Sequence, residues 1–205
     1  MSTTRRIGTE TSQTRTALLD ATERLMLEEG YAAVTSRRVA ARAGLKPQLV
    51  HYYFRTMDDL FLAAYRRRAE QGLERLDQAL EAPQPLWAMW DLSRDPRGTA
   101  LTMEFVALAN HRKPIRAEIA ASAERYRAAV RAGVDTVLER YGVDRRRYPA
   151  IVCTVMMMGV AQILVIEEES LGMATGHGET VAFVEQLLTE IEGSRQAAAD
   201  ALASA

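Results

Sequence analysis

The residues between Ser36 and Arg55 have the chemistry of a phosphate-binding surface. This stretch contains no aspartate or glutamate, and it contains five basic side chains: Arg37, Arg38, Arg42, Lys46 and Arg55. A solvated helix usually mixes both signs of charge, whereas a run of one sign suits a polyanion. The segment therefore predicts contact with a nucleic-acid backbone, with phosphates held by Ser36, Arg37, Lys46 and Arg55.

The same segment offers side chains that can read bases. Gln48, Leu49, His51 and Tyr52 lie within one short predicted helix. A glutamine can pair with adenine, and an apolar side chain such as Leu49 can contact the methyl group of thymine. We expect these four residues to face base edges while their basic neighbours hold the backbone.

Residues suited to catalysis are few. The chain has three histidines, and none of them completes a Glu-x-x-His pair. There is no Gly-x-Ser-x-Gly sequence and no glycine loop of the kind that cradles phosphate. Glu167, Glu168 and Glu169 are adjacent, so they do not share a helix face, and we expect a solvated helix end there. The sequence predicts no catalytic residue, no metal site and no cofactor.

Two helices and a glycine turn must position the basic and base-reading side chains. A hydroxyl of Thr35 or Ser36 can cap the first helix. Gly44 stands where the chain must reverse, because glycine adopts a left-handed conformation without steric cost. Pro47 suits the first turn of the second helix, which is expected over residues 48–53. This is the helix-turn-helix plan, whose second helix can lie in the DNA major groove; an ordinary helical hairpin is the alternative.

Charge is divided unevenly along the 205 residues. The whole chain has a net charge of −1, but residues 1–68 hold 12 basic and 7 acidic side chains and the remainder is acidic. A basic head on an acidic body fits a polyanion partner for the head alone. The run Arg66, Arg67, Arg68 is expected to be a solvated face. Residues 1–16 carry no apolar secretory segment, so we expect a cytoplasmic protein.

The body contains a run of sixteen residues without a charge, Ile151 to Ile166. Such a helix is expected to be buried on all sides, and it is shorter than the roughly 20 apolar residues of a membrane span. We predict no membrane contact and a two-fold helical dimer interface formed with the last helix. The interface residues are expected to be Val155, Ile163, Ile166, Val184, Leu188 and Ile191.

Large, adaptable side chains are also concentrated in the body. Tryptophan and methionine suit a pocket for a flexible or apolar small molecule, although plain core packing would use the same residues. Gln162 is the one uncharged amide inside the apolar run and needs a hydrogen-bond partner, either across a dimer or on a ligand. The candidate ligand-binding residues are Trp87, Trp90, Met103, Phe105, Tyr126, Met157 and Gln162.

The stretch from Arg15 to Leu60 resembles the DNA-binding domain of the tetracycline-repressor (TetR) family of bacterial regulators. The matching elements are Leu18-Leu19-Asp20-Ala21, Gly30-Tyr31, Thr35, Val39-Ala40, Ala43-Gly44-Leu45, Val50, Tyr53-Phe54 and Asp59-Leu60. The sequence departs from the family at three positions, where Ser or Thr, Tyr, and Lys are usual: Lys46, His51 and Met57. The resemblance implies a dimeric regulator whose body binds a small effector.

We predict an all-α chain with an N-terminal three-helix helix-turn-helix domain and a C-terminal helical bundle. The expected divisions are a flexible arm (1–14), a DNA-binding domain (15–68), an effector-binding and dimerisation domain (69–193) and a loose tail (194–205). The predicted function is a homodimeric repressor on a near-palindromic double-stranded DNA operator, released by a small, largely apolar effector of unknown identity. The alternatives are an activator, a regulator whose body responds to a protein partner and, more remotely, a ligand-binding helical enzyme.

Overall fold

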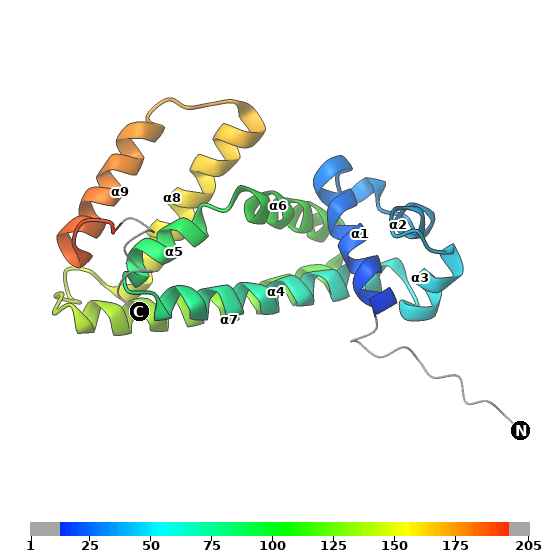
Figure 1. Ribbon diagram of the computed structural model, residues 1–205, viewed down its shortest axis with the longest axis horizontal. Helices are drawn as coiled ribbons and strands as arrows, with labels where there is room; N and C mark the ends of the chain where they lie inside the picture. The colour runs from blue at the N-terminus through cyan, green and yellow to red at the C-terminus, as the bar shows by residue number, and fades with distance from the viewer. Residues whose placement is uncertain (1–12, 197–205) are drawn as a thin grey trace, which may run out of the picture. The chain divides into compact units, whose positions relative to one another are not determined.

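The computed structural model describes residues 13–196, and these residues form helices and connecting loops without a strand (Figure 1). The all-α prediction is therefore confirmed. In chain order the elements are α1 (Gln13–Glu29), the 3-10 helix η1 (Tyr31–Ala33), α2 (Ser36–Arg42), α3 (Pro47–Tyr53), α4 (Met57–Glu81), α5 (Pro85–Ser93), α6 (Pro96–His111), α7 (Lys113–Arg140), α8 (Ala150–Leu171) and α9 (His177–Glu192). The predicted arm lies outside the described residues except for its last two.

The turn between α2 and α3 follows from local sequence. The Thr35 hydroxyl accepts the backbone N–H of Arg38 at 3.3 Å and caps α2. At the other end the N–H groups of Gly44 and Leu45 donate to the carbonyls of Ala41 and Ala40, at 3.1 and 2.8 Å. This pair of bonds is a Schellman motif, and it requires the left-handed φ of +68° that Gly44 adopts. Pro47 begins α3, as predicted.

The start of α4 is fixed by a reciprocal cap. The N–H of Asp59 donates to the Thr56 hydroxyl, and the N–H of Thr56 donates to the Asp59 carboxylate, both at 3.0 Å. Two backbone donors that the helix leaves unpaired are satisfied in this way. Because α4 begins four residues after α3 ends, fixing the start of α4 also restricts the position of the end of α3.

The described chain divides into two compact units. The first contains residues up to 70 together with 100–122, and the second contains 71–99 and 123 onwards. The long α4 contributes to both units, as do α6 and α7. The first unit therefore contains more than the helix-turn-helix segment: α6 and the beginning of α7 pack with it, and Leu101, Phe105, Leu108 and Ile115 are buried in the same core as α1 to α4.

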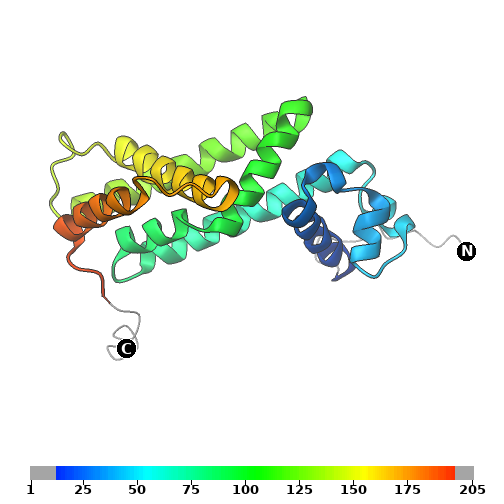
Figure 2. The same cartoon turned by 90° about the horizontal axis from the view of Figure 1, so that it is seen from above.

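The second unit is built around α5, which packs against both α8 and α9 (Figures 1 and 2). Its two hydrophobic clusters have Met89 and Trp90 among their buried members. Gly133 lies where α7 approaches Leu80 of α4, because a Cβ built on it would stand 2.6 Å from the Leu80 side chain. The residues just after α9 are hydrogen-bonded to the side chain of Gln84, which precedes α5. Its amide N–H donates to the carbonyl of Ser194, and its amide oxygen accepts the N–H of Gln196.

The apolar helix α8 differs from expectation in one respect. Its inner face is buried, but Val152, Val155, Met156 and Ile163 are 47 to 58% exposed. Burial on all sides is thus not achieved by one chain alone. Among the described residues α8 is the one helix whose length and composition would suit a membrane span, yet its last turns carry Glu167, Glu168 and Glu169.

Candidate nucleic-acid interface

The outward face of α3 carries the predicted base-reading residues. Gln48, His51 and Tyr52 are exposed, and Leu49 is half-buried beside them. On the inner side Val50 is almost completely buried and ties α3 to the core. The arrangement leaves amide, imidazole and phenol groups on one solvent-facing surface of a helix that is held rigidly from behind, which is the geometry that groove recognition needs.

The five basic side chains between residues 36 and 55 are not equivalent. Arg38 forms an ion pair and hydrogen bond with Glu29, and Arg42 pairs with Glu28 at 2.5 Å and with Glu29 at 3.7 Å. The hydrogen bond from Arg38 lowers the pKa of Glu29. Two of the five positive charges are therefore neutralised by the end of α1, a pairing that the sequence analysis did not foresee.

The other three basic residues are those predicted to hold phosphates. Arg37, Lys46 and Arg55 are exposed, and within residues 13–196 none of them has an ion-pair partner. Ser36, the first residue of α2, is half-buried next to Arg37. Three unpaired cations around an exposed helix face form an electrostatic surface suited to a phosphate backbone.

Sequence reasoning missed Arg15, which lies next to this surface. Its guanidinium stands 5.3 Å from the ring centre of Phe54, the residue that follows α3. The ring of Phe54 is buried, so Arg15 covers it in a cation–π contact. Met57, where the family usually has a lysine, packs its side chain against the core of the first unit.

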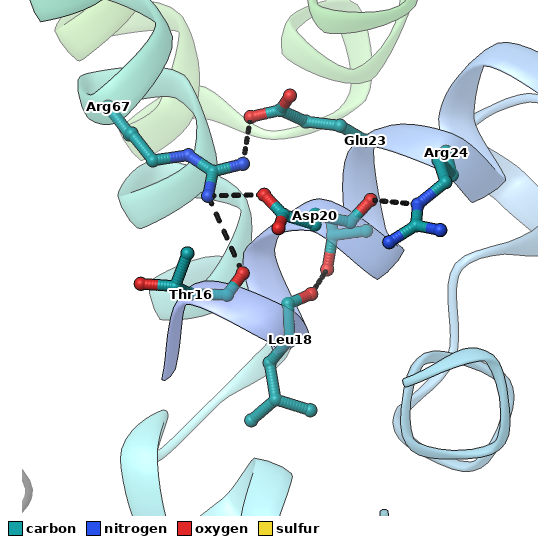
Figure 3. Close-up of polar contacts among 7 residues, drawn as sticks. Thr16, Leu18, Asp20, Glu23, Arg24 and Arg67 are labelled. Carbon is teal, nitrogen blue, oxygen red and sulfur yellow. Dashed lines mark hydrogen bonds and ion pairs between the residues drawn. The ribbon is translucent and has the colours of Figure 1, made fainter. Parts of the chain in front are cut away.

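The interpretation of Arg66, Arg67 and Arg68 as a solvated face is wrong for two of the three: Arg68 is half-buried and bonds to Thr102, and Arg67 lies in an ion-pair network. Arg67 is 20% exposed and binds two carboxylates of α1, Asp20 at 2.7 Å and Glu23 at 2.6 Å (Figure 3). Burial alone would lower the pKa of Arg67, but the hydrogen bonds and charges of Glu23 and Asp20 outweigh it and raise the pKa. Arg67 thus joins α4 to α1 behind the helix-turn-helix.

The acidic cluster is likewise not a solvated helix end throughout. The Glu167 carboxylate lies 2.9 Å from Nε2 of His177, the first residue of α9. His177 is buried, and its Nδ1 has no partner among the described residues. Glu168 and Glu169 are exposed, as predicted.

The predicted ligand-binding residues are divided between the two units. Met103 and Phe105 belong to the first, where Phe105 is fully buried against Tyr65 and Met103 is 39% exposed. In the second unit Trp87 and Trp90 share a buried cluster against which Met157 packs. Tyr126 packs on the neighbouring cluster, which Met157 also contacts, and Gln162 is half-buried on α8.

The predicted dimer residues show a mixture of burial. Val155 and Ile163 are 47% and 48% exposed, and they are joined on the outer face of α8 by Val152 and Met156. Ile166, Val184 and Ile191 are half-buried, whereas Leu188 is buried inside its own chain. Phe183 of α9, which was not predicted, is 60% exposed. The sequence could have suggested Phe183, because it is the one large aromatic side chain of the last helix and lies next to the predicted interface residue Val184.

The sequence of the first unit matches a known family. Residues 18–64 fit the model of a family described as bacterial regulatory proteins, tetR family. Over 52 residues the chain is 40% identical to the HTH-type transcriptional regulator BetI of Rhizobium meliloti (strain 1021). That match spans 25% of the chain and 26% of the relative, so it covers about a quarter of the relative's length.

Solved structures resemble a much larger part of the chain. A putative TetR-family transcriptional regulator from a Rhodococcus species has a TM-score of 0.70 at 16% identity, covering 88% of this chain and all of the other. A TetR transcription regulator from Haloarcula marismortui gives 0.67 at 21%, covering 86% and 96%. A putative transcriptional regulator from Saccharomonospora viridis in complex with choline gives 0.70 at 19%, covering 84% and 96%. These likenesses show that the all-α fold of the solved regulators extends over most of this chain and is not limited to residues 18–64.

Proposed function

We propose that this chain, whose residues 18–64 match the model of the tetR family of bacterial regulatory proteins, is a DNA-binding repressor that binds a near-palindromic operator as a homodimer. The observation that carries the proposal is the outward face of α3. Gln48, His51 and Tyr52 are exposed there, close in sequence to three cations that no carboxylate within the described chain neutralises.

In the proposed complex α3 lies in the major groove. Gln48 pairs with an adenine and Leu49 contacts a thymine methyl, while Arg37, Lys46 and Arg55 hold phosphates. Two subunits related by a two-fold axis read half-sites separated by about one helical turn, roughly 34–36 Å. Selection from a randomised DNA pool tests this: an enriched inverted repeat supports it, and binding without sequence preference contradicts it.

The proposed dimer uses the exposed apolar face of α8. This face is uncharged from Ile151 to Ile166, so a second copy can approach it without repulsion. At its centre stands Gly159, exposed and with no atom within 4 Å of the position of a Cβ. A glycine costs a helix interior about 1 kcal/mol relative to alanine, and close helix crossing is a physical reason to place one there. We propose that α8 crosses its copy at Gly159, between Val155 and Ile163.

A cysteine at the crossing point would lie next to its own copy. In a Cys153→Ser background, Gly159→Cys is expected to form an intersubunit disulfide on mild oxidation, because two such residues near a two-fold axis come within the Cα separation of about 4.4–6.8 Å that a disulfide needs. Ser170→Cys is the matched control, since it stands eleven residues, about 16 Å, further along the helix. Equal cross-linking of both variants, or none, contradicts a crossing at Gly159.

The effector is proposed to be small and largely apolar, bound in the second unit near Trp90 and Met157. The structural neighbour from Saccharomonospora viridis was solved with choline. In the present chain, however, Arg94 stands 5.4 Å from the ring centre of Trp90, and Arg195 stands 5.5 Å from that of Trp87. An arginine already occupies a face of each ring, which disfavours a second cation there. Release of labelled operator by uncharged apolar molecules, but not by choline, is the expected result.

A further inference from the structure

We propose that Glu104 of α6 is a positioning residue for DNA binding, because it holds the backbone at the entrance to the helix-turn-helix. The inference rests on the proposed function. Oε2 of Glu104 accepts the backbone N–H of Tyr31 at 2.6 Å, across 73 residues of sequence. Among the described residues Glu104 has no ion-pair partner. The carboxylate is thus dedicated to a single backbone donor.

The bond is made where the chain leaves α1. Gly30 has φ +82° and ψ 162°, a conformation that glycine adopts readily and other residues do not. The Gly30 N–H still donates to the carbonyl of Met26 at 3.0 Å, but the next N–H, that of Tyr31, has no helical acceptor. Glu104 supplies that acceptor. A charged acceptor makes a stronger bond to a backbone N–H than a neutral one.

The same helix also holds the side chain of Tyr31. Its ring stacks on the ring of His111, with centroids 6.4 Å apart and planes inclined by 28°. His111 is the last residue of α6 and stands seven positions after Glu104, so the two lie on one side of the helix. Tyr31 is therefore held at two points by α6, at its backbone and at its ring.

From Tyr31 the constraint passes directly into α2. The short helix η1 ends at Ala33, the N–H of Val34 donates to the carbonyl of Tyr31 at 3.1 Å, and Thr35 caps α2. The Schellman turn at Gly44 then ties α2 to α3. No flexible linker lies between Tyr31 and the DNA-facing helix, so displacement of Tyr31 shifts the surface that carries Gln48.

A neighbouring contact of α6 provides a control. Arg68 donates to the hydroxyl of Thr102 at 3.1 Å, which joins α6 to α4 without touching η1. Thr102→Val removes that acceptor while leaving the size of the side chain nearly unchanged. If Glu104 acts only by holding α6 in place, Thr102→Val and Glu104→Ala will have similar effects on DNA binding.

The test compares Glu104→Ala, Glu104→Gln and Thr102→Val in the full chain, at a temperature where each is folded by circular dichroism. Two quantities are measured: affinity for the operator selected by the wild-type protein, and the amide resonances of residues 31–53 in the DNA-free protein. For Glu104→Ala we expect affinity to fall about tenfold or more, with loss of Tyr31 amide protection and shifted resonances in α2 and α3. Glu104→Gln keeps an acceptor oxygen and should restore most of the affinity, and Thr102→Val should change neither quantity.

Two results would overturn the inference. One is a Glu104→Ala protein whose α2 and α3 resonances match those of the wild type. The other is a Thr102→Val protein with shifts and affinity losses equal to those of Glu104→Ala. The resonance measurement needs no DNA, so it decides the role of Glu104 even if the wild-type protein selects no operator, a result that would instead refute the proposed function.

Discussion

The ion pairs at the end of α1 allow a sharp prediction about the salt dependence of DNA binding. Arg37 and Arg38 are adjacent on α2, yet only Arg38 is neutralised by Glu29. We compare Arg37→Ala with Arg38→Ala. Each unpaired cation that contacts a phosphate releases a counterion on binding, whereas a cation already paired with a carboxylate releases little. Removing Arg37 should therefore weaken the salt dependence, and removing Arg38 should not.

The magnitude follows from the number of unpaired cations. Arg37, Lys46 and Arg55 are present once in each subunit, so a dimer contributes twice three phosphate contacts. The plot of log affinity against log salt concentration should then have a slope of about −5.4 for the wild type and for Arg38→Ala, and about −3.6 for Arg37→Ala. Between 50 and 200 mM salt the affinity should fall on the order of 10³-fold for the first two and 10²-fold for the third.

The assay is a fluorescence-anisotropy titration of operator DNA at four or more salt concentrations. Thermal unfolding of each variant serves as the control for folding, because the pair between Arg38 and Glu29 is exposed and contributes little to stability. Equal slopes for Arg37→Ala and the wild type would refute the phosphate role of Arg37. A slope for Arg38→Ala as low as that for Arg37→Ala would show that DNA displaces the Glu29 pair.

The other predictions concern specificity, stability and assembly. Gln48→Ala should relax the preference at one base position by about 1–3 kcal/mol; an unchanged preference in a binding-site selection would remove Gln48 from base readout. Arg67→Met should lower the free energy of unfolding by about 2 kcal/mol, since it leaves two carboxylates unpaired, whereas Arg66→Met breaks an exposed pair and should cost under about 1 kcal/mol. Urea denaturation distinguishes the two, and equal losses would contradict the account. Val155→Arg should yield a folded monomer in sedimentation, and a stable dimer would place the interface elsewhere.

The helix-turn-helix was predictable because its determinants are local. The Thr35 cap, the left-handed Gly44 and Pro47 at the start of α3 each depend on a few neighbouring residues, and all three are found as expected. The expectation that Gln48, His51 and Tyr52 face away from the core likewise came from the residues of one short helix, and all three are exposed. Such rules need no knowledge of the rest of the chain.

The contacts that were missed join residues far apart in sequence. Nothing in the run Arg66 to Arg68 indicates that Arg67 alone turns toward two carboxylates of α1, 44 and 47 residues earlier. The bond from Tyr31 to Glu104 spans 73 residues, and its acceptor lies in a helix that sequence reasoning assigned to the body. Pairing of this kind depends on how helices pack, which hydrophobic periodicity alone does not specify.

The exposed face of α8 illustrates a different limit. The run from Ile151 to Ile166 is apolar on every side, and the prediction that it is buried on every side is wrong for this chain taken alone. A single chain, however, covers only the face that includes Thr154 and Ala161, and leaves Met156 and Ile163 exposed. Sequence periodicity does not distinguish a core helix from one that is completed by a second copy, because both are apolar all round.

Selection of bound sequences from a randomised double-stranded DNA pool, at low and at moderate salt, tests the central proposal most directly. We expect an enriched inverted repeat whose half-sites are centred about one helical turn apart, and the same repeat should be recovered at both salt concentrations. Binding at low salt that disappears at moderate salt without any enriched sequence would contradict it, because the cations near α3 would then act without base recognition.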